Sequence, residues 1–158
     1  MEHIDVIDEE GNVLYAAPRV TIYKEKLLHN IAHVFIYDEN GRMLLQKRGR
    51  SVSYYPNTWC TAAAGHIQAG ESPQQGASRE LHEELGVAVP IKHLGTHHYQ
   101  KDGPPKKLCV FTCICEGPFS LSEHEVEDIA WFTPEALKEI PPQEMHPELA
   151  FLLTIYAP

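Results

Sequence analysis

One well-marked helix is the feature that most limits how this chain can fold. Ser72 is a strong N-cap, Pro73 fits the first helical position, and Gln75 can complete a capping box. Gly86 is a natural stop at the C-terminal end, because glycine adopts the left-handed conformation there without steric cost. The sequence therefore predicts a helix over Pro73–Leu85.

The chain on both sides of this helix has the pattern of strands and turns. The pair Asn40-Gly41 predicts a hairpin turn, because both residues tolerate positive φ. Strands precede and follow the helix, with further helices only at the end, and this order favours an α+β fold over a regular βαβ alternation. The expected strands are Asp5–Ile7, Val13–Ala16, Ile31–Tyr37, Met43–Arg48, Ala62–Ala64, Lys92–Gln100, Leu108–Glu116 and Asp128–Phe132, and the expected last helices begin at Thr133-Pro134 and at Pro147.

The length and the net charge of the chain limit the classes of function that it can have. The chain has 158 residues, and domains typically run to about 100–200 residues, so residues 1–158 are expected to form a single domain. With 13 Lys and Arg against 22 Asp and Glu, the net charge is −9, which disfavours binding to a nucleic-acid polymer. No apolar run reaches the roughly 18 residues that span a bilayer. The acidic start lacks a signal-peptide pattern, so we expect a cytoplasmic protein with no membrane association.

Three carboxylates occupy one face of the predicted helix. Glu80, Glu83 and Glu84 are spaced i, i+3 and i+4, which brings them together one turn apart. Such a face is either spread into water or held together by cations, and hard divalent ions such as Mg²⁺ prefer oxygen ligands. Arg79 precedes Glu83 by four residues and can pair with it.

The loop before the helix completes a longer pattern. Gly65 and Gly70 allow tight backbone turns, and Glu71 lies just before the N-cap. Together, the loop and helix resemble the Nudix box, G-x5-E-x7-R-E-U-x-E-E-x-G-U with U apolar, from Gly65 to Val87. Every specified position matches: Gly65, Glu71, Arg79, Glu80, Leu81, Glu83, Glu84, Gly86 and Val87. An ordinary acidic surface helix would not explain the outlying positions at these offsets.

The resemblance to the Nudix hydrolase family implies both a fold and a reaction. The implied fold is an α/β/α sandwich around a mixed β-sheet. The implied reaction is hydrolysis, dependent on Mg²⁺ or Mn²⁺, of a diphosphate bond in a nucleoside-diphosphate-linked or related organic pyrophosphate. The partner is thus a small phosphorylated metabolite, and a homodimer is left open.

The same resemblance assigns roles to residues in the box. Glu80, Glu83 and Glu84 would hold the metal, with the backbone carbonyl of Ala64 as a further ligand. Arg79 would orient the glutamates, and Glu71 would support the loop.

The residue that acts as general base can come from either of two parts of the chain. It comes either from the box or from a carboxylate elsewhere in the chain. Glu125 stands where some Nudix relatives place a distal metal-binding glutamate, and the alternative is a solvated acidic loop around it.

A second, partial resemblance is to isopentenyl diphosphate isomerases. Those enzymes use histidines that correspond to His29 and His66, but their cysteine before the Gly-His pair is Ala64 here, and Lys107 stands where a glutamate is wanted. Isomerase-like chemistry and a non-catalytic Nudix-fold binding module are therefore the alternatives to a hydrolase. His29 and His66 are either pocket residues or satisfied hydrogen-bonding residues.

Two further residues are candidates for substrate binding. Arg48 can meet the distal phosphate, or it can be part of a charged hairpin end. Trp59, just before the box, can stack on a base, or it can pack against the core.

Overall fold

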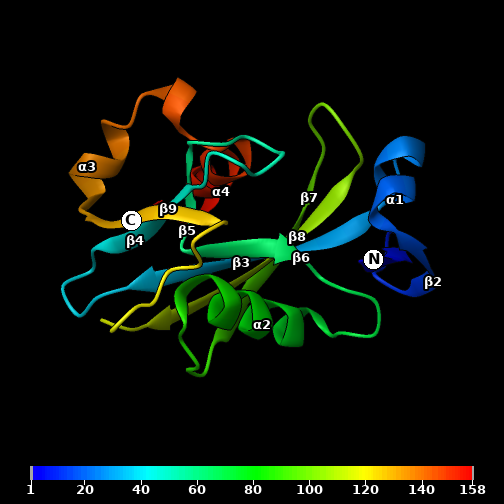
Figure 1. Ribbon diagram of the computed structural model, residues 1–158, viewed down its shortest axis with the longest axis horizontal. Coiled ribbons are helices and arrows are strands. Elements are labelled where there is room, and N and C mark those ends of the chain that lie inside the picture. Colours follow the sequence, from blue (N-terminus) through cyan, green and yellow to red (C-terminus); the bar gives the residue numbers. More distant parts are fainter. Residues whose placement is uncertain (1, 158) are drawn as a thin grey trace.

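The computed structural model describes residues 2–157 (Figure 1). It contains nine strands, four α-helices and one 3-10 helix. In chain order these are β1 (His3–Ile7), β2 (Val13–Pro18), α1 (Arg19–Glu25), β3 (His29–Tyr37), β4 (Met43–Arg48), β5 (Trp59–Thr61), β6 (Ala63–His66), α2 (Pro73–Leu85), β7 (Lys92–Tyr99), β8 (Lys106–Ile114), β9 (Val126–Phe132), α3 (Pro134–Lys138), η1 (Pro142–Glu144) and α4 (Pro147–Tyr156).

The sheet is mixed and is organised around β3. β3 and β8 run parallel over their full length, in register from His29↔Lys106 to Tyr37↔Ile114. The expected hairpin of β3 and β4 forms, but the two strands pair only next to the turn, at Ile36↔Leu44 and Tyr37↔Met43. Beyond that point β3 pairs with β6, and β4 pairs with β5 and β9. The sheet therefore splits between these two groups of strands.

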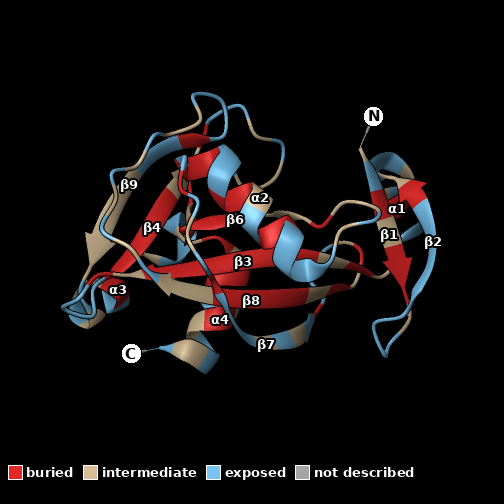
Figure 2. Ribbon diagram, turned by 90° about the horizontal axis from the view of Figure 1, so that it is seen from below, coloured by how far each residue is buried: buried red, intermediate tan, exposed pale blue. Residues whose placement is uncertain are grey.

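Helices cover both faces of the sheet. α2 lies on one face and α4 on the other, and the buried side of α2 points to the strands (Figures 1 and 2). The alternation of side chains along β3 supplies both cores, because Ala32 and Val34 belong to the cluster under α2 while Ile31 and Phe35 belong to the cluster under α4. The predicted α+β fold, an α/β/α sandwich with a mixed sheet, is confirmed.

The predicted helix begins and ends at the expected residues. The Ser72 hydroxyl accepts a hydrogen bond from the Gln75 backbone N–H, and the Gln75 side chain accepts one from the Ser72 N–H. Gly86 ends the helix in the left-handed conformation with φ of 68°. Ala77, Leu81 and Leu85 are buried against the sheet.

Three elements were absent from the sequence-based expectation: α1, β5 and the short 3-10 helix η1. α1 has no side-chain cap, and among its residues only Ile22 is buried, so neither capping nor periodicity marked it. β5 is only three residues long and is defined by its pairing with β4. β6 extends past the expected Ala64 to His66, and β8 ends at Ile114 rather than at Glu116.

Within residues 2–157, no helix combines the length and the apolar character needed to cross a bilayer.

Candidate active site

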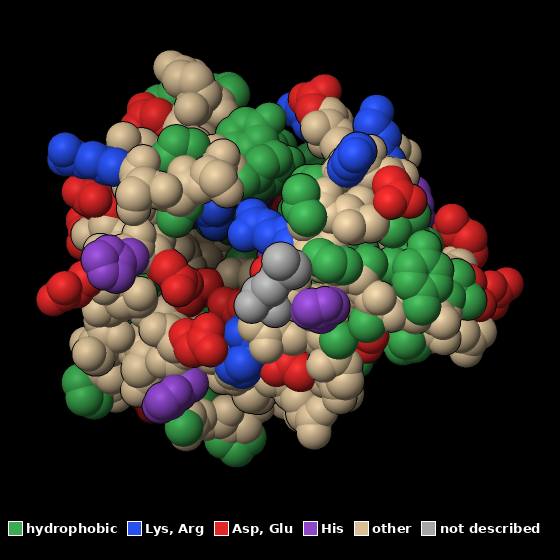
Figure 3. Space-filling model, turned by 45° about the vertical axis from the view of Figure 1, so that its right-hand side comes forward, with side chains coloured by type: hydrophobic (Ala, Val, Ile, Leu, Met, Phe, Trp, Pro, Cys, Tyr) green, Lys and Arg blue, Asp and Glu red, His purple; other side chains and the backbone are tan. Residues whose placement is uncertain are grey.

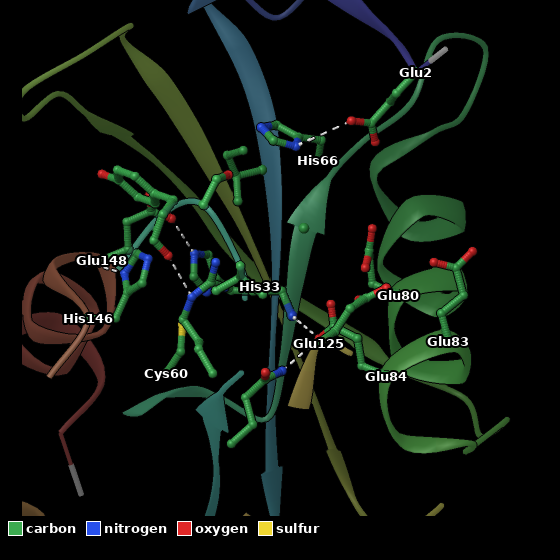
Figure 4. Close-up of a pocket in the computed structure, with 18 of the residues that line it drawn as sticks. Glu2, His33, Cys60, His66, Glu80, Glu83, Glu84, Glu125, His146 and Glu148 are labelled. Carbon is green, nitrogen blue, oxygen red and sulfur yellow. Dashed lines mark hydrogen bonds and ion pairs between the residues drawn. The ribbon is translucent and has the colours of Figure 1, made fainter. Parts of the chain in front are cut away.

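The three glutamates of α2 divide into two kinds of environment. Glu80 and Glu84 are buried, at 7% and 5% exposed, and follow each other by one turn on the side of the helix that meets β6. The Glu83 side chain is 48% exposed and pairs with Arg79 across 3.2 Å. Figure 4 shows Glu80 and Glu84 pointing toward the sheet, with Glu83 farther out on the same helix. The helix face that carries the three glutamates is therefore buried at Glu80 and Glu84 and exposed at Glu83.

A third carboxylate, from the exposed Glu125 in the turn before β9, joins the buried pair Glu80 and Glu84. One carboxylate oxygen from each of Glu80, Glu84 and Glu125 lies within 4.8 Å of the others. Glu125 is brought there by Gly49 at the end of β4, whose N–H donates to the Glu125 carbonyl at 2.9 Å. A Cβ on Gly49 would come within 2.6 Å of the His124 carbonyl oxygen, so a side chain there would push this segment away.

Gly65 permits the close approach of β6 to α2. A Cβ at this position would lie 2.3 to 2.6 Å from the carboxylate atoms of Glu80. The backbone of the strand and this carboxylate can thus be neighbours only because residue 65 has no side chain. The first glycine of the Nudix pattern consequently has a packing reason in this chain.

Arg79 connects the loop with the glutamates. Its guanidinium donates to Glu71 at 2.6 and 3.0 Å, to Glu80 at 2.9 Å, and to the His66 carbonyl at 3.0 Å. Glu71 also accepts the Gln68 backbone N–H at 2.8 Å, which closes the loop before α2. These contacts are those expected of a residue that orients Glu80 and a residue that supports the loop.

Glu84 is held by neutral donors rather than by a cation. It accepts hydrogen bonds from the Gln46 side chain at 2.6 Å and from the Ala64 N–H at 3.1 Å. Burial, with the neighbouring charge of Glu80, raises the pKa of Glu84 well above its usual value. Burial also raises the pKa of Glu80, although Arg79 opposes the shift. Two buried carboxylates with a single arginine beside them are therefore short of positive charge.

This donor set fits a hard divalent cation. The nearby groups are all carboxylate oxygens, which Mg²⁺ and Mn²⁺ prefer over sulfur or imidazole. A cation among Glu80, Glu84 and the exposed Glu125 would also supply the positive charge that the burial of Glu80 and Glu84 demands.

A cleft of about 370 Å³ adjoins the three glutamates. It lies where the sheet splits, so side chains of the α2 side and of the α4 side both reach it (Figure 4). Arg48 and His66 line this cleft, as predicted for substrate-binding residues.

The other two predicted substrate-binding residues lie elsewhere. His29 is fully buried with its ring 5.6 Å from that of His66, and its Nε2 has no hydrogen-bond partner among the described residues. Trp59 does not line the cleft; it packs edge-on against Phe132 at 5.1 Å. The reason is strand alternation, because the next residue, Cys60, faces the cleft instead.

Several cleft residues had not been identified from the sequence. They are polar side chains that are mostly buried within apolar elements, and this mismatch was the available signal. His33 interrupts the apolar run of β3, and Glu148 opens the apolar helix α4. The buried ones are His33, Gln46, Cys60, Lys106, His146 and Glu148, and the less buried ones include Arg19 and Tyr23.

Comparison with known proteins identifies the family. The NUDIX domain model matches residues 27–152 of the chain. The chain belongs to the Nudix family. It is 32% identical over 137 residues to the uncharacterized Nudix hydrolase YfcD of Escherichia coli K12, covering 86% of this chain and 76% of that protein.

Two further comparisons agree with this assignment. An isopentenyl-diphosphate Delta-isomerase of Streptomyces avermitilis is 31% identical over 144 residues, covering 86% of this chain and 73% of that protein. The crystal structure of DR0079 from Deinococcus radiodurans superposes with a TM-score of 0.82 at 21% identity, covering 98% of each chain. The protein is a Nudix hydrolase, and the general activity of that family is the metal-assisted hydrolysis of pyrophosphates.

Proposed function

We propose that this Nudix hydrolase cleaves a diphosphate bond in a small organic pyrophosphate, nucleoside-diphosphate-linked or related, with Mg²⁺ or Mn²⁺. The observation that carries the proposal is the convergence of Glu80, Glu84 and Glu125 within 4.8 Å beside a cleft of small-molecule size. We further propose that residues 1–158 act as one Nudix domain. All four cysteines are free thiols, which supports a reducing compartment such as the cytoplasm.

Each charged residue among the specified positions of the box has a role in this proposal. Glu80, Glu84 and Glu125 hold the ion, with the Ala64 carbonyl as a further ligand, whereas Glu83, also predicted as a ligand, is not part of this group of carboxylates. A bound divalent ion supplies positive charge to the diphosphate oxygens and acidifies a nearby water. Arg79 holds Glu80 in place, and Glu71 holds Arg79.

Glu83 is the proposed general base. It lines the cleft, and its greater exposure leaves it free to reach a water outside the buried pair. The oxygen of that water forms the new bond to phosphorus while the bridging P–O bond breaks, and Glu83 accepts the proton.

The isomerase alternative lacks its chemical groups in this cleft. Ala64 stands where the thiol is required, and its methyl group can neither donate nor accept a proton. Lys107, at the position of the second required group, donates to the Glu9 carbonyl on the surface and does not line the cleft.

The experiment is a screen of organic diphosphates with and without Mg²⁺ or Mn²⁺, read by release of phosphate or nucleoside monophosphate. Glu84→Gln should lower turnover by at least about tenfold, because even the residues that support metal ligands typically contribute that much. Glu135→Gln is the matched control, since Glu135 is exposed on α3 and away from the cleft.

Three outcomes would contradict the proposal. These are turnover that does not need a metal, full activity of Glu84→Gln, and ligand binding with no hydrolysis of any diphosphate. Solvent deuterium incorporated into isopentenyl diphosphate would instead establish the isomerase reaction.

A further inference from the structure

The end of the cleft away from α2 contains two basic side chains that share one carboxylate. Lys106 Nζ donates to Oε2 of Glu148 at 2.8 Å, and His33 Nε2 lies 2.8 Å from Oε1 of the same residue. All three residues are buried, at 4%, 0% and 3% exposed for Lys106, His33 and Glu148 respectively, and all line the cleft. We refer to Lys106, His33 and Glu148 as the buried triad.

The hydrogen bonds of His33 place a proton on Nε2 and allow a second one on Nδ1. Nε2 faces the Glu148 carboxylate, which can only accept. Nδ1 lies 2.8 Å from the Thr61 hydroxyl, and that hydroxyl lies 3.2 Å from the Ala63 carbonyl. The single Thr61 proton can serve either the Ala63 carbonyl or Nδ1 of His33, and the first arrangement, with a proton on Nδ1, makes the imidazole a cation. The buried triad then carries one more positive than negative charge.

The pKa of His33 agrees with this geometry. Burial lowers the pKa, but the interactions with Cys60 and Glu148 outweigh burial and raise it to about 9.

A neutral donor beside the buried triad has no acceptor. His146 Nδ1 accepts the Glu148 backbone N–H at 3.0 Å, which places the ring proton on Nε2. Burial lowers the pKa of His146 to about 3, so the ring stays neutral. The residue is 3% exposed and lines the cleft, and within residues 2–157 Nε2–H has no hydrogen-bond partner. Nε2–H is accessible from the cleft rather than sealed in the core, so a ligand in the cleft can accept from it.

Two arginines add to the positive charge of this end. Arg48 uses only Nε within the described part of the chain, donating to the Tyr54 carbonyl at 3.0 Å, so both terminal nitrogens are available. Arg19 lines the same cleft and reaches Ser53 across 3.5 Å. In Figure 3, Lys or Arg side chains lie beside a hollow on this face, and Asp or Glu side chains lie below it.

We propose that this end of the cleft binds a second anionic group of the substrate, a phosphate or a carboxylate, away from the diphosphate that is cleaved. An excess positive charge is costly to bury, and an incoming anion offsets that cost while accepting from His146 and Arg48. The inference rests on the proposed function for the position of the scissile diphosphate. It adds that the substrate carries negative charge at both ends.

The ring of Tyr54 supports an anion rather than a stacked base. Lys106 Nζ lies 4.5 Å from its centroid, so this ring face holds the ammonium group. The edges of Tyr55 and His146 pack around the same ring, at 4.6 and 5.3 Å between centroids. The aromatic residues at this end therefore pack on one another and on the cation.

The first test uses the metal-free protein and needs no turnover. Inorganic phosphate, with acetate in a parallel arm, is titrated while the ring N–H signal of His146 is followed by NMR. We expect saturable binding in the wild type and a loss of at least about tenfold in affinity for Lys106→Met, because the variant removes a buried positive charge beside the bound anion, and an interaction with a charged group typically contributes that much. The two arms distinguish a phosphate site from a carboxylate site.

Lys107→Met is the matched control, because it removes the same charge from the neighbouring residue, outside the cleft. His146→Asn serves if Lys106→Met fails to fold, since asparagine can keep the helix cap but removes the ring N–H. No saturable response to either anion in the wild type, or equal losses for Lys106→Met and Lys107→Met, would overturn the inference.

The second test compares alkyl diphosphates of equal length that end in methyl, carboxylate or phosphate. We expect kcat/KM to be at least about tenfold higher for a charged end in the wild type, and this preference to disappear in Lys106→Met. Equal hydrolysis of all three would refute the second anion site but not the hydrolase. Phosphate binding in the first test without hydrolysis of any diphosphate would refute the hydrolase but not the anion site.

Discussion

At the scale of single residues, the approach of Gly65 to Glu80 decides where the carboxylate can lie. The first atoms that a Cβ would meet belong to the end of a flexible side chain, not to backbone. Glu80 can therefore move away from an added methyl group, at little cost to folding but at the expense of its position beside Glu84 and Glu125.

For Gly65→Ala we expect loss of metal binding with little loss of stability. Mn²⁺ affinity, measured by electron paramagnetic resonance, should fall by at least about tenfold, as for other disturbances of metal-ligand placement. Gly103→Ala is the control, because the nearest atom to a Cβ there is 4.0 Å away. Unchanged Mn²⁺ affinity in Gly65→Ala would show that Glu80 is not placed by this contact.

At the scale of elements, the two ends of α2 are set by its own capping residues, whereas its second half carries the buried glutamates. Its capping box and its glycine stop satisfy backbone groups that would otherwise be unpaired at the helix ends. Glu80 and Glu84 lie in the second half of the helix, two turns or more beyond the cap. Stability and activity therefore depend on different parts of the same helix.

Ser72→Ala should separate these two properties. Loss of the N-cap is expected to lower the free energy of unfolding by about 1 kcal/mol, measured by denaturant titration. The turnover number should be retained, because the cap contacts none of the cleft glutamates. Ser72→Asp should restore stability, since aspartate also accepts from the Gln75 N–H. Full stability of Ser72→Ala would mean that tertiary packing alone sets this end of α2.

At the scale of the whole molecule, buried histidines make stability depend on pH. Burial lowers the pKa of His29 to about 4, and it lowers the pKa of His66 and of His146 to about 3. The unfolded chain binds protons at these sites below about pH 6.5, whereas the folded protein does not. Protonation thus favours unfolding as the pH falls.

Each of these histidines should cost about 1.4 kcal/mol of stability per pH unit between pH 6.5 and its folded pKa. Denaturant titrations of the metal-free wild type and of His146→Asn at several pH values isolate one contribution. The difference in unfolding free energy between the two proteins should change in favour of the variant as the pH falls. Parallel curves for the two proteins would contradict the assignment of a neutral, buried His146.

The part of the site that is formed by residues close together in the sequence could largely be predicted from the sequence. The helix, its caps and the spacing of its glutamates depend on contacts within four residues, as does the pairing of Arg79 with Glu83. Gly65 and Glu71 were placed by a motif that is itself local. These predictions succeeded because hydrogen bonds over such short separations form in much the same way in any chain with these residues.

The other half of the site arises from strand pairing and burial between residues that are far apart in the sequence. The parallel pairing of β3 with β8 brings Lys106 to Glu148 and His33, and Gly49 brings Glu125 to the glutamates of α2. The strands β3 and β4 separate only because each has another partner to pair with. The sequence alone thus determined the carboxylate helix and the family. Tertiary structure decided the split sheet, the exclusion of Trp59 and the cationic end of the cleft, because the partner of a strand depends on which surfaces of the whole chain can be buried together.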